Sequence, residues 1–269
     1  MEPVLQVDSL SKRFGSIVAL ERVSFSLEAG SLMGLIGPNG SGKTTLLNTL
    51  NGLYRPDSGE IRYRGRSTRN LRPHQLALLG VSRTFQNARV FHTLTVSQNM
   101  LVPLVHAHLP GSVARERARQ LLTFVGLERY QALPASELSG GQQKLLEFAR
   151  ALMTEPRLVL MDEPFGGVHP EIKALLLERI REAQQDRQVS FIIVSHEIPD
   201  LMSLAQTIIC MSYGQIIARG TPQEVSEHPD VIAAYLGHAG GRGQAQTLPS
   251  SSSSLSSSSA LEQAGGQPS

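Results

Sequence analysis

The segment Gly37–Thr45, which reads GPNGSGKTT, constrains the fold of this 269-residue chain more than any other. It matches the pattern G-x-x-x-x-G-K-[ST] at every fixed position, follows the apolar run SLMGLIG and opens a helical pattern at Lys43. In such a loop, glycines let backbone N–H groups surround phosphate oxygens, the lysine neutralises the β- and γ-phosphates, and a threonine hydroxyl ligates Mg²⁺. The sequence therefore predicts a nucleotide-phosphate loop between a strand and a helix, with contacts from Gly37, Asn39, Gly40, Ser41, Gly42, Lys43, Thr44 and Thr45.

The rest of the chain alternates short apolar runs with longer helical patterns, as in an α/β protein with a mostly parallel sheet. Residues 157–164 and 189–197 are apolar runs typical of buried parallel strands, and 207–220 predicts a hairpin. The alternating runs VSFSLEAG and GEIRYRG predict a smaller antiparallel sheet. Residues 87–156 read as mostly helix and loop. We therefore predict an α/β fold: a P-loop NTPase core with a mostly parallel sheet, an N-terminal antiparallel β subdomain and an inserted helical subdomain.

Two acids end the apolar run that starts at residue 157. A strand end beside the phosphate loop is where open α/β sheets bind ligands. We expect Asp162 to hold Mg²⁺, directly or through water, and Glu163 to polarise a water for attack on the γ-phosphate. The alternative is that the pair only caps a strand before Pro164. His196 ends another apolar strand, and Gln86 follows a short one; each is a weak signal by itself.

A second glycine-led helix start occurs in ELSGGQQKLLEFARAL, residues 137–152. Free backbone N–H groups and the positive end of the helix dipole make such a start a natural seat for an anion. The chain already has a phosphate seat far upstream. The pattern alone does not say what the second seat binds.

Composition narrows the class of protein. The net charge is +2, from 25 basic and 23 acidic side chains, so we expect no nucleic-acid partner.

No export signal is visible, and no apolar run approaches the roughly 18–20 residues that cross a bilayer, so we expect a soluble cytoplasmic protein. The single cysteine, Cys210, lies in an apolar run and is expected to be buried. Residues 238–269 are rich in Gly, Ser and Gln, and we expect a disordered tail, with an interaction tail as the alternative.

The order of these motifs is specific: a phosphate loop, a glutamine, LSGGQ, a strand ending in DE and a strand ending in histidine. In this order the chain resembles the ATP-binding subunits of ABC transporters, which implies one ABC ATP-binding domain at 1–237, with the helical subdomain at about 87–156. The resemblance implies ATP and Mg²⁺ as cofactors, Phe14 as the aromatic that stacks on adenine, and His196 as a γ-phosphate contact. Gln86 would sense the γ-phosphate and report to the membrane partner. The catalytic residues would be Glu163, His196 and Gln86, and the metal residues Thr44, Gln86 and Asp162.

The resemblance also gives the second seat a task. In this family Ser139, Gly140, Gly141 and Gln142 close over the ATP that a second protomer holds, head to tail. It implies a homo- or heterodimer, integral membrane permease subunits and, indirectly, an external solute-binding protein. It also implies a peripheral location on the cytoplasmic face of the inner or plasma membrane.

Three segments favour one branch of the family: GVSRTFQNARVFHTLTVSQNMLV, MSLAQTIICMSYGQIIARGTPQEV and VIAAYLG resemble importers of branched-chain amino acids and related amides, including urea. DEPFGGVHP and YLG also resemble the ATPase of lipopolysaccharide export, which is the second hypothesis. Three more functions fit parts of the pattern: a soluble non-transport ABC ATPase, a P-loop phosphotransferase and an assembly subunit with little hydrolysis.

His169 stands where the amino-acid importers commonly carry asparagine, and we hypothesise slower or pH-sensitive coupling between sites. We also expect part of the surface at 86–101 to receive a coupling helix from the membrane subunit.

Overall fold

The computed structural model describes residues 3–105 and 109–239, so nearly all of the predicted tail lies outside the described residues. The strands are β1 (Pro3–Phe14), β2 (Ile17–Glu28), β3 (Leu32–Ile36), β4 (Ser58–Tyr63), β5 (Arg66–Ser67), β6 (Val81–Arg83), β7 (Leu158–Asp162), β8 (Ser190–Val194), β9 (Thr207–Ser212) and β10 (Gln215–Gly220). The helices are α1 (Lys43–Leu50), α2 (Pro73–Leu78), α3 (Val96–Leu101), α4 (Gly111–Phe124), α5 (Gly140–Leu152), α6 (Pro170–Gln185), α7 (Ile198–Leu204), α8 (Pro222–Ser226) and α9 (Pro229–Ala239), with short 3₁₀ helices η1 (Val102–Leu104), η2 (Glu128–Tyr130) and η3 (Ala135–Glu137).

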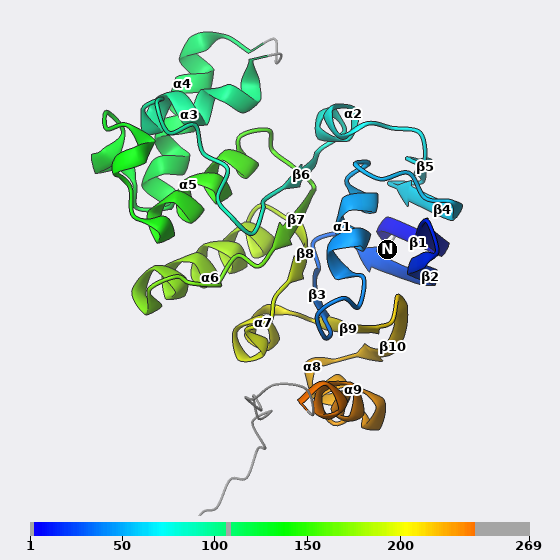
Figure 1. The fold of residues 1–269 in the computed structure, drawn as a ribbon. Helices are drawn as coiled ribbons and strands as arrows, with labels where there is room; N and C mark the ends of the chain where they lie inside the picture. The colour runs from blue at the N-terminus through cyan, green and yellow to red at the C-terminus, as the bar shows by residue number, and fades with distance from the viewer. Residues whose placement is uncertain (1–2, 106–108, 240–269) are drawn as a thin grey trace, which may run out of the picture.

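These strands form two sheets (Figure 1). The smaller sheet is antiparallel, with the order β2-β1-β4-β5. The larger sheet has the order β10-β9-β3-β8-β7-β6 and is parallel except for the β9–β10 hairpin, which turns at Tyr213 and Gly214. Helices α3, α4 and α5 lie between β6 and β7 in the chain and project to one end of the molecule in Figure 1. The predicted fold class is therefore confirmed.

The strands of the larger sheet are buried on both faces. In β7, Val159 and Met161 belong to one hydrophobic cluster, whereas Leu158 and Leu160 belong to another. Successive side chains of a strand point to opposite faces, so each strand serves two cores. The first cluster includes residues of α5 and α6, and the second includes residues of α1 and the antiparallel sheet. This two-sided burial explains why these strands read as continuous apolar runs.

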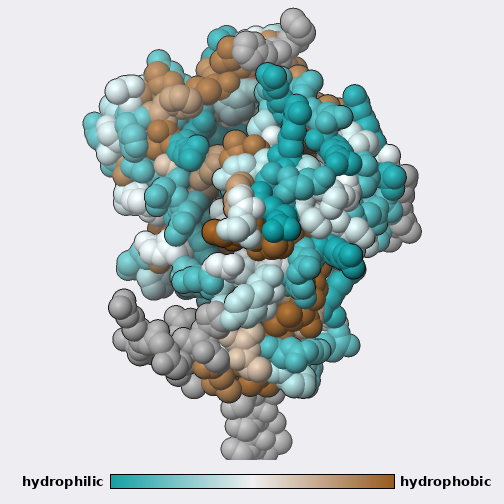
Figure 2. Space-filling view, turned by 45° about the vertical axis from the view of Figure 1, so that its right-hand side comes forward, coloured by the Kyte–Doolittle hydropathy of each residue, from teal (hydrophilic) through white to brown (hydrophobic). Residues whose placement is uncertain are grey.

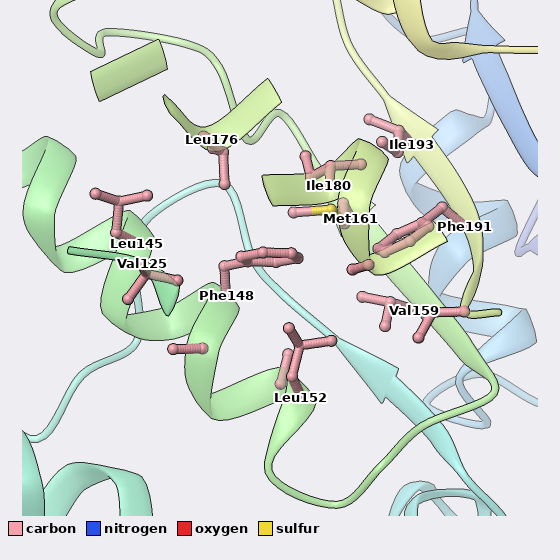
Figure 3. Close-up of a cluster of buried hydrophobic side chains, with 14 of the residues drawn as sticks. Val125, Leu145, Phe148, Leu152, Val159, Met161, Leu176, Ile180, Phe191 and Ile193 are labelled. Carbon is pink, nitrogen blue, oxygen red and sulfur yellow. The ribbon is translucent and has the colours of Figure 1, made fainter. Parts of the chain in front are cut away.

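Phe148 fixes helix α5 to the larger sheet. Its side chain is fully buried, and its ring centroid lies 6.5 Å from that of Phe191 in β8. Figure 3 shows the ring among apolar side chains from α5, α6 and β7, including Leu152, Leu176 and Met161. The packed core therefore holds helix α5, including its first residues, against the larger sheet. Truncating Phe148 to alanine would lower the free energy of unfolding by about 3–5 kcal/mol.

Strand order gathers the predicted motifs at one edge of the larger sheet. Strands β6, β7, β8 and β3 are neighbours and run parallel, so their carboxyl ends lie side by side. Gln86 follows β6, Asp162 ends β7, His196 follows β8 and the phosphate loop follows β3. Ligands of open α/β sheets bind outside such ends.

The surface carries hydrophilic residues around separate hydrophobic groups on the face drawn in Figure 2. Within the described part of the chain, every helix is too short or too polar to span a bilayer.

In the predicted docking surface at 86–101, Phe91 is 46% exposed but Val96 is completely buried. Only part of that segment is therefore available to a partner. Cys210 is buried as predicted, and burial raises the pKa of its thiol to about 12.

Candidate functional site

A pocket of about 830 Å³ opens at the edge where the four parallel strands end. It is lined by every predicted residue of the phosphate loop and by the predicted residues that follow the neighbouring strands: Gly37, Asn39, Gly40, Ser41, Gly42, Lys43, Thr44, Thr45, Gln86, Asp162, Glu163 and His196. The topology thus brings together, in one chain, groups suited to bind phosphate, to hold a cation and to accept a proton.

The phosphate loop requires glycine where its backbone lies closest to other segments of the same chain. Gly42 adopts a φ of 103°, and a Cβ there would lie 2.5 Å from the carbonyl oxygen of Ala19. A Cβ at Gly37 would collide with the carbonyl oxygen of Met211. Gly42 is also the N-cap of α1 and provides no side-chain cap. The first N–H groups of α1 are therefore left for an external anion.

Lys43 is the cation of this loop. Its ammonium donates hydrogen bonds to the carbonyl oxygens of Gly37 (2.7 Å) and Pro38 (2.9 Å). Burial lowers the pKa of Lys43, while the nearby Glu163, Cys210 and Asp162 act in the opposite direction. A partly desolvated ammonium attracts a phosphate group more strongly than a hydrated one, because less water screens it.

Asp162 is buried at the end of β7, and its carboxylate faces Arg83 at 3.4 Å. Burial raises the pKa of Asp162, and Arg83 and Lys43 oppose that rise. Thr44 and Gln86, which line the same pocket, are exposed. In residues 3–105 and 109–239, no group of three His, Cys, Asp or Glu side chains could hold a metal ion. A cation here would depend on one carboxylate, a hydroxyl, an amide oxygen and substrate phosphates, a donor set that fits Mg²⁺.

Glu163 and His196 contact each other. The Glu163 carboxylate lies 2.7 Å from His196 Nδ1 and accepts a hydrogen bond from the His196 backbone N–H at 3.0 Å. Glu163 has a φ of 50°, an uncommon conformation for a residue with a side chain and one that clusters at functional sites. The histidine therefore holds the carboxylate at the pocket wall, while its own ring stays largely exposed.

Lys144 supports the same turn from helix α5, and no sequence pattern pointed to it. Its ammonium donates to the carbonyl oxygens of Glu163 (3.0 Å) and Gly166 (2.7 Å). One turn later, the buried Glu147 accepts a hydrogen bond from the Arg89 backbone N–H at 3.0 Å. Burial raises the pKa of Glu147. Helix α5 is therefore bonded both to the Glu163 turn and to the segment that follows Gln86.

Phe14 and the second glycine seat do not line the pocket within this chain. Phe14 is 42% exposed, and its ring meets that of Tyr54 edge-on at 5.1 Å. It pairs across the β1–β2 turn with Ile17, which does line the pocket. Ser139, Gly140, Gly141 and Gln142 form the start of α5, where Ser139 and Gln142 cap each other. His169 is exposed and is the N-cap of α6.

Tyr235 is a second residue that we did not predict from the sequence. It lines the pocket from α9, and its hydroxyl accepts a hydrogen bond from the backbone N–H of Gly37 at 2.9 Å. The helical spacing of Val231 and Tyr235 in VIAAYLG indicates that both lie on one helix face, but it does not identify the backbone of Gly37 as the partner.

Comparison with known proteins identifies two matching families and several relatives of similar sequence. The ABC transporter family matches residues 20–166, and the family described as branched-chain amino acid ATP-binding cassette transporter matches residues 215–240. The chain is 36% identical to the high-affinity branched-chain amino acid transport ATP-binding protein BraF of Pseudomonas aeruginosa, over 88% of this chain and 99% of BraF. It is 38% identical to the probable branched-chain amino acid transport ATP-binding protein LivG of Archaeoglobus fulgidus, over 87% of this chain and 95% of LivG.

Similarity also extends to a different importer and to a solved structure. The chain is 39% identical to the probable sulfate/thiosulfate import ATP-binding protein CysA of Chlorella vulgaris, over 86% of this chain and 98% of CysA. A crystal structure of the ADP conformation of an ATP-binding cassette of an ABC transporter matches with a TM-score of 0.80 and 31% identity, over 88% of this chain and all of that chain. The resemblance drawn from the motifs is confirmed. The chain belongs to the ABC transporter family, among its ATP-binding proteins that hydrolyse ATP.

Proposed function

We propose that this chain is the ATP-hydrolysing subunit of an ABC importer for branched-chain amino acids or related amides such as urea. The observation that carries the solute class is the match of residues 215–240 to the branched-chain amino acid cassette family, because this segment lies outside the 20–166 match to the general family. The similarity to BraF over 99% of its length supports the same class. The similarity to CysA makes an importer of sulfur oxyanions the second candidate.

In this proposal ATP binds with its phosphates at the start of α1. The uncapped N–H groups of that helix and the Lys43 ammonium supply positive charge where the phosphates lie. Phe14, next to the pocket-lining Ile17, is the proposed adenine contact. When bound, Mg²⁺ would be held by Thr44, Gln86 and Asp162 and would neutralise charge on the β- and γ-phosphates.

Hydrolysis then requires a base beside the γ-phosphate. We assign that role to Glu163, which accepts a proton from the attacking water as the bond between the γ-phosphorus and the bridging oxygen breaks. His196 already contacts the Glu163 carboxylate through Nδ1. The histidine can therefore orient the base, and its exposed ring can reach the γ-phosphate.

We propose that the site is completed by a second ATPase protomer, the same or a related chain. The Ser139–Gln142 seat is partly exposed and outside the pocket of its own chain, which supports a role on a neighbouring molecule. We further propose integral membrane permease subunits as partners, with a peripheral location on the cytoplasmic face of the membrane. The domain would span 1–237, with the helical subdomain inserted at 87–156.

Co-purification from native membranes tests this function. We expect the chain to bring down permease subunits of the amino-acid and amide importer type, with ATP hydrolysis stimulated by a branched-chain amino acid or amide bound to its external binding protein. Stimulation by sulfate or thiosulfate would move the assignment to the second candidate. Recovery of lipopolysaccharide-export subunits, or of active ATPase with no membrane protein, would contradict the importer function.

A further inference from the structure

Tyr235 links the C-terminal helix α9 to the phosphate loop across 198 residues of sequence. The backbone N–H of Gly37 donates a hydrogen bond to the Tyr235 hydroxyl oxygen at 2.9 Å. The Tyr235 side chain is partly buried against the larger hydrophobic cluster, and it lines the pocket. Helix α9 therefore contributes an atom that touches the phosphate loop itself.

Gly37 is the point where the chain leaves the larger sheet. Ile36, just before it, still pairs with Cys210 of β9, whereas Gly37 turns away with a φ of 141°. A backbone N–H that leaves a buried strand costs free energy unless it finds an acceptor. Tyr235 supplies that acceptor, while the Lys43 ammonium binds the Gly37 carbonyl oxygen at 2.7 Å. The loop is thus fixed at its first residue by two side chains.

The spacing of α9 explains how the hydroxyl arrives there. Val231 is completely buried, and Tyr235 follows four residues later on the same helix face. Ile232 and Leu236, on the other side, are 37% and 64% exposed. Burial raises the pKa of Tyr235 to about 12, so the side chain stays a neutral phenol at physiological pH. The C-terminal match at 215–240 includes this residue.

We propose that Tyr235 is a positioning residue of the nucleotide site, holding the first residue of the phosphate loop so that the loop is shaped for phosphate before nucleotide binds. The inference rests on the proposed role of the pocket as the ATP site. Helix α9 would then increase the affinity for nucleotide, because a loop that already has its bound shape loses less conformational entropy on binding.

The full-length chain with Tyr235→Phe tests this, because the substitution removes only the hydroxyl. Tyr63→Phe is the matched control: Tyr63 is also buried, its hydroxyl donates to the Gly80 carbonyl oxygen at 3.3 Å, and it lies outside the pocket. We expect Tyr235→Phe to raise the Kd and KM for ATP about three- to tenfold, with kcat within about twofold. Tyr63→Phe should leave the Kd unchanged. Calorimetric titration with ATP and ADP gives the Kd, and thermal melting checks folding.

Two results would overturn the inference: a wild-type Kd for ATP in a folded Tyr235→Phe protein, or an equal loss of affinity in Tyr63→Phe. The first result counts against it even if the melting temperature is lower, because that outcome shows a structural role alone. Lys43→Ala separates this failure from failure of the ATP site. If Lys43→Ala weakens ATP binding while Tyr235→Phe does not alter it, the pocket assignment stands and only the role of Tyr235 falls.

Discussion

The two glycine-led helix starts of this chain look alike in sequence but differ in structure. Helix α1 begins after Gly42, which adopts a φ of 103° and provides no side-chain cap. Helix α5 begins after Ser139, whose hydroxyl accepts a hydrogen bond from the Gln142 N–H at 3.3 Å, while the Gln142 side-chain oxygen accepts from the Ser139 N–H at 2.9 Å. The first start is open to an anion, and the second is partly closed by its own side chains.

Their surroundings differ as well. The open start lies in a pocket with Lys43, Asp162 and Glu163, because four parallel strands end there. The capped start faces outward, and Ser139 and Gly140 are exposed. Glycines and a helix dipole therefore give only a local geometry, and strand order decides whether charged groups are present. Under the proposed function, the capped start would obtain the rest of its site from another molecule.

Glu163→Gln separates binding from chemistry at the open start and has the largest expected effect. Removing a general base should lower the ATP hydrolysis rate at least about 100-fold, while ATP affinity is retained. The measurement is phosphate release alongside ATP titration. A turnover rate within tenfold of the wild-type rate would remove Glu163 from the role of base.

Lys43→Ala tests the charge at the open start. Losing charge-assisted hydrogen bonds to phosphate should raise the Kd for ATP roughly 10- to 100-fold. The increase in melting temperature that ATP causes should become smaller accordingly. Arg119→Ala, which removes an exposed ion pair with Glu116, is the control and should bind ATP normally. Unchanged affinity in Lys43→Ala would contradict the pocket assignment.

Lys144→Met tests the link between the two starts. Lys144 belongs to α5 but binds the carbonyl oxygens of Glu163 and Gly166, so its loss should let the Glu163 turn relax. We expect kcat to fall about tenfold with the KM for ATP little changed, because only the base is displaced. Lys144→Arg, which keeps the charge and donors, should restore most of the rate. A fall in kcat that arginine does not rescue would contradict this role.

Ser139→Ala should have the smallest effect on an isolated chain. It removes the cap of α5, which costs about 0.5–2 kcal/mol of stability. It should not alter the Kd for ATP, because Ser139 does not line the pocket of its own chain. Denaturant melts and ATP titration measure the two quantities separately. Weaker ATP binding by an isolated, folded protomer would mean that the two starts share one site in the same chain.

Most of the fold and much of the pocket could be predicted from the sequence. Continuous apolar runs identify two-sided strands such as β7 and β8, and residues at the ends of neighbouring parallel strands must meet at one edge. That is why the phosphate loop, Gln86, Asp162, Glu163 and His196 converge as expected.

Lys144 and Tyr235 escaped prediction for a common reason. Their partners are backbone atoms, the carbonyl oxygens of Glu163 and Gly166 and the N–H of Gly37. Every residue type carries a carbonyl and nearly every type an N–H, so no pattern of side chains announces the contact. Such bonds become visible only when the tertiary packing of α5 and α9 is known.

A photo-crosslinking amino acid at Gly140 tests most directly whether the capped start completes the site of another ATPase molecule. Gly140 is exposed, and a Cβ there would meet no atom within 4 Å among the described residues. The experiment uses the complex purified from native membranes, with Glu163→Gln in the same chain, with and without ATP and Mg²⁺. We predict an ATP-dependent crosslink to the phosphate-loop peptide of a second ATPase chain, identified by mass spectrometry. A crosslink to the phosphate loop of the same chain, or none that depends on ATP, would contradict a shared site.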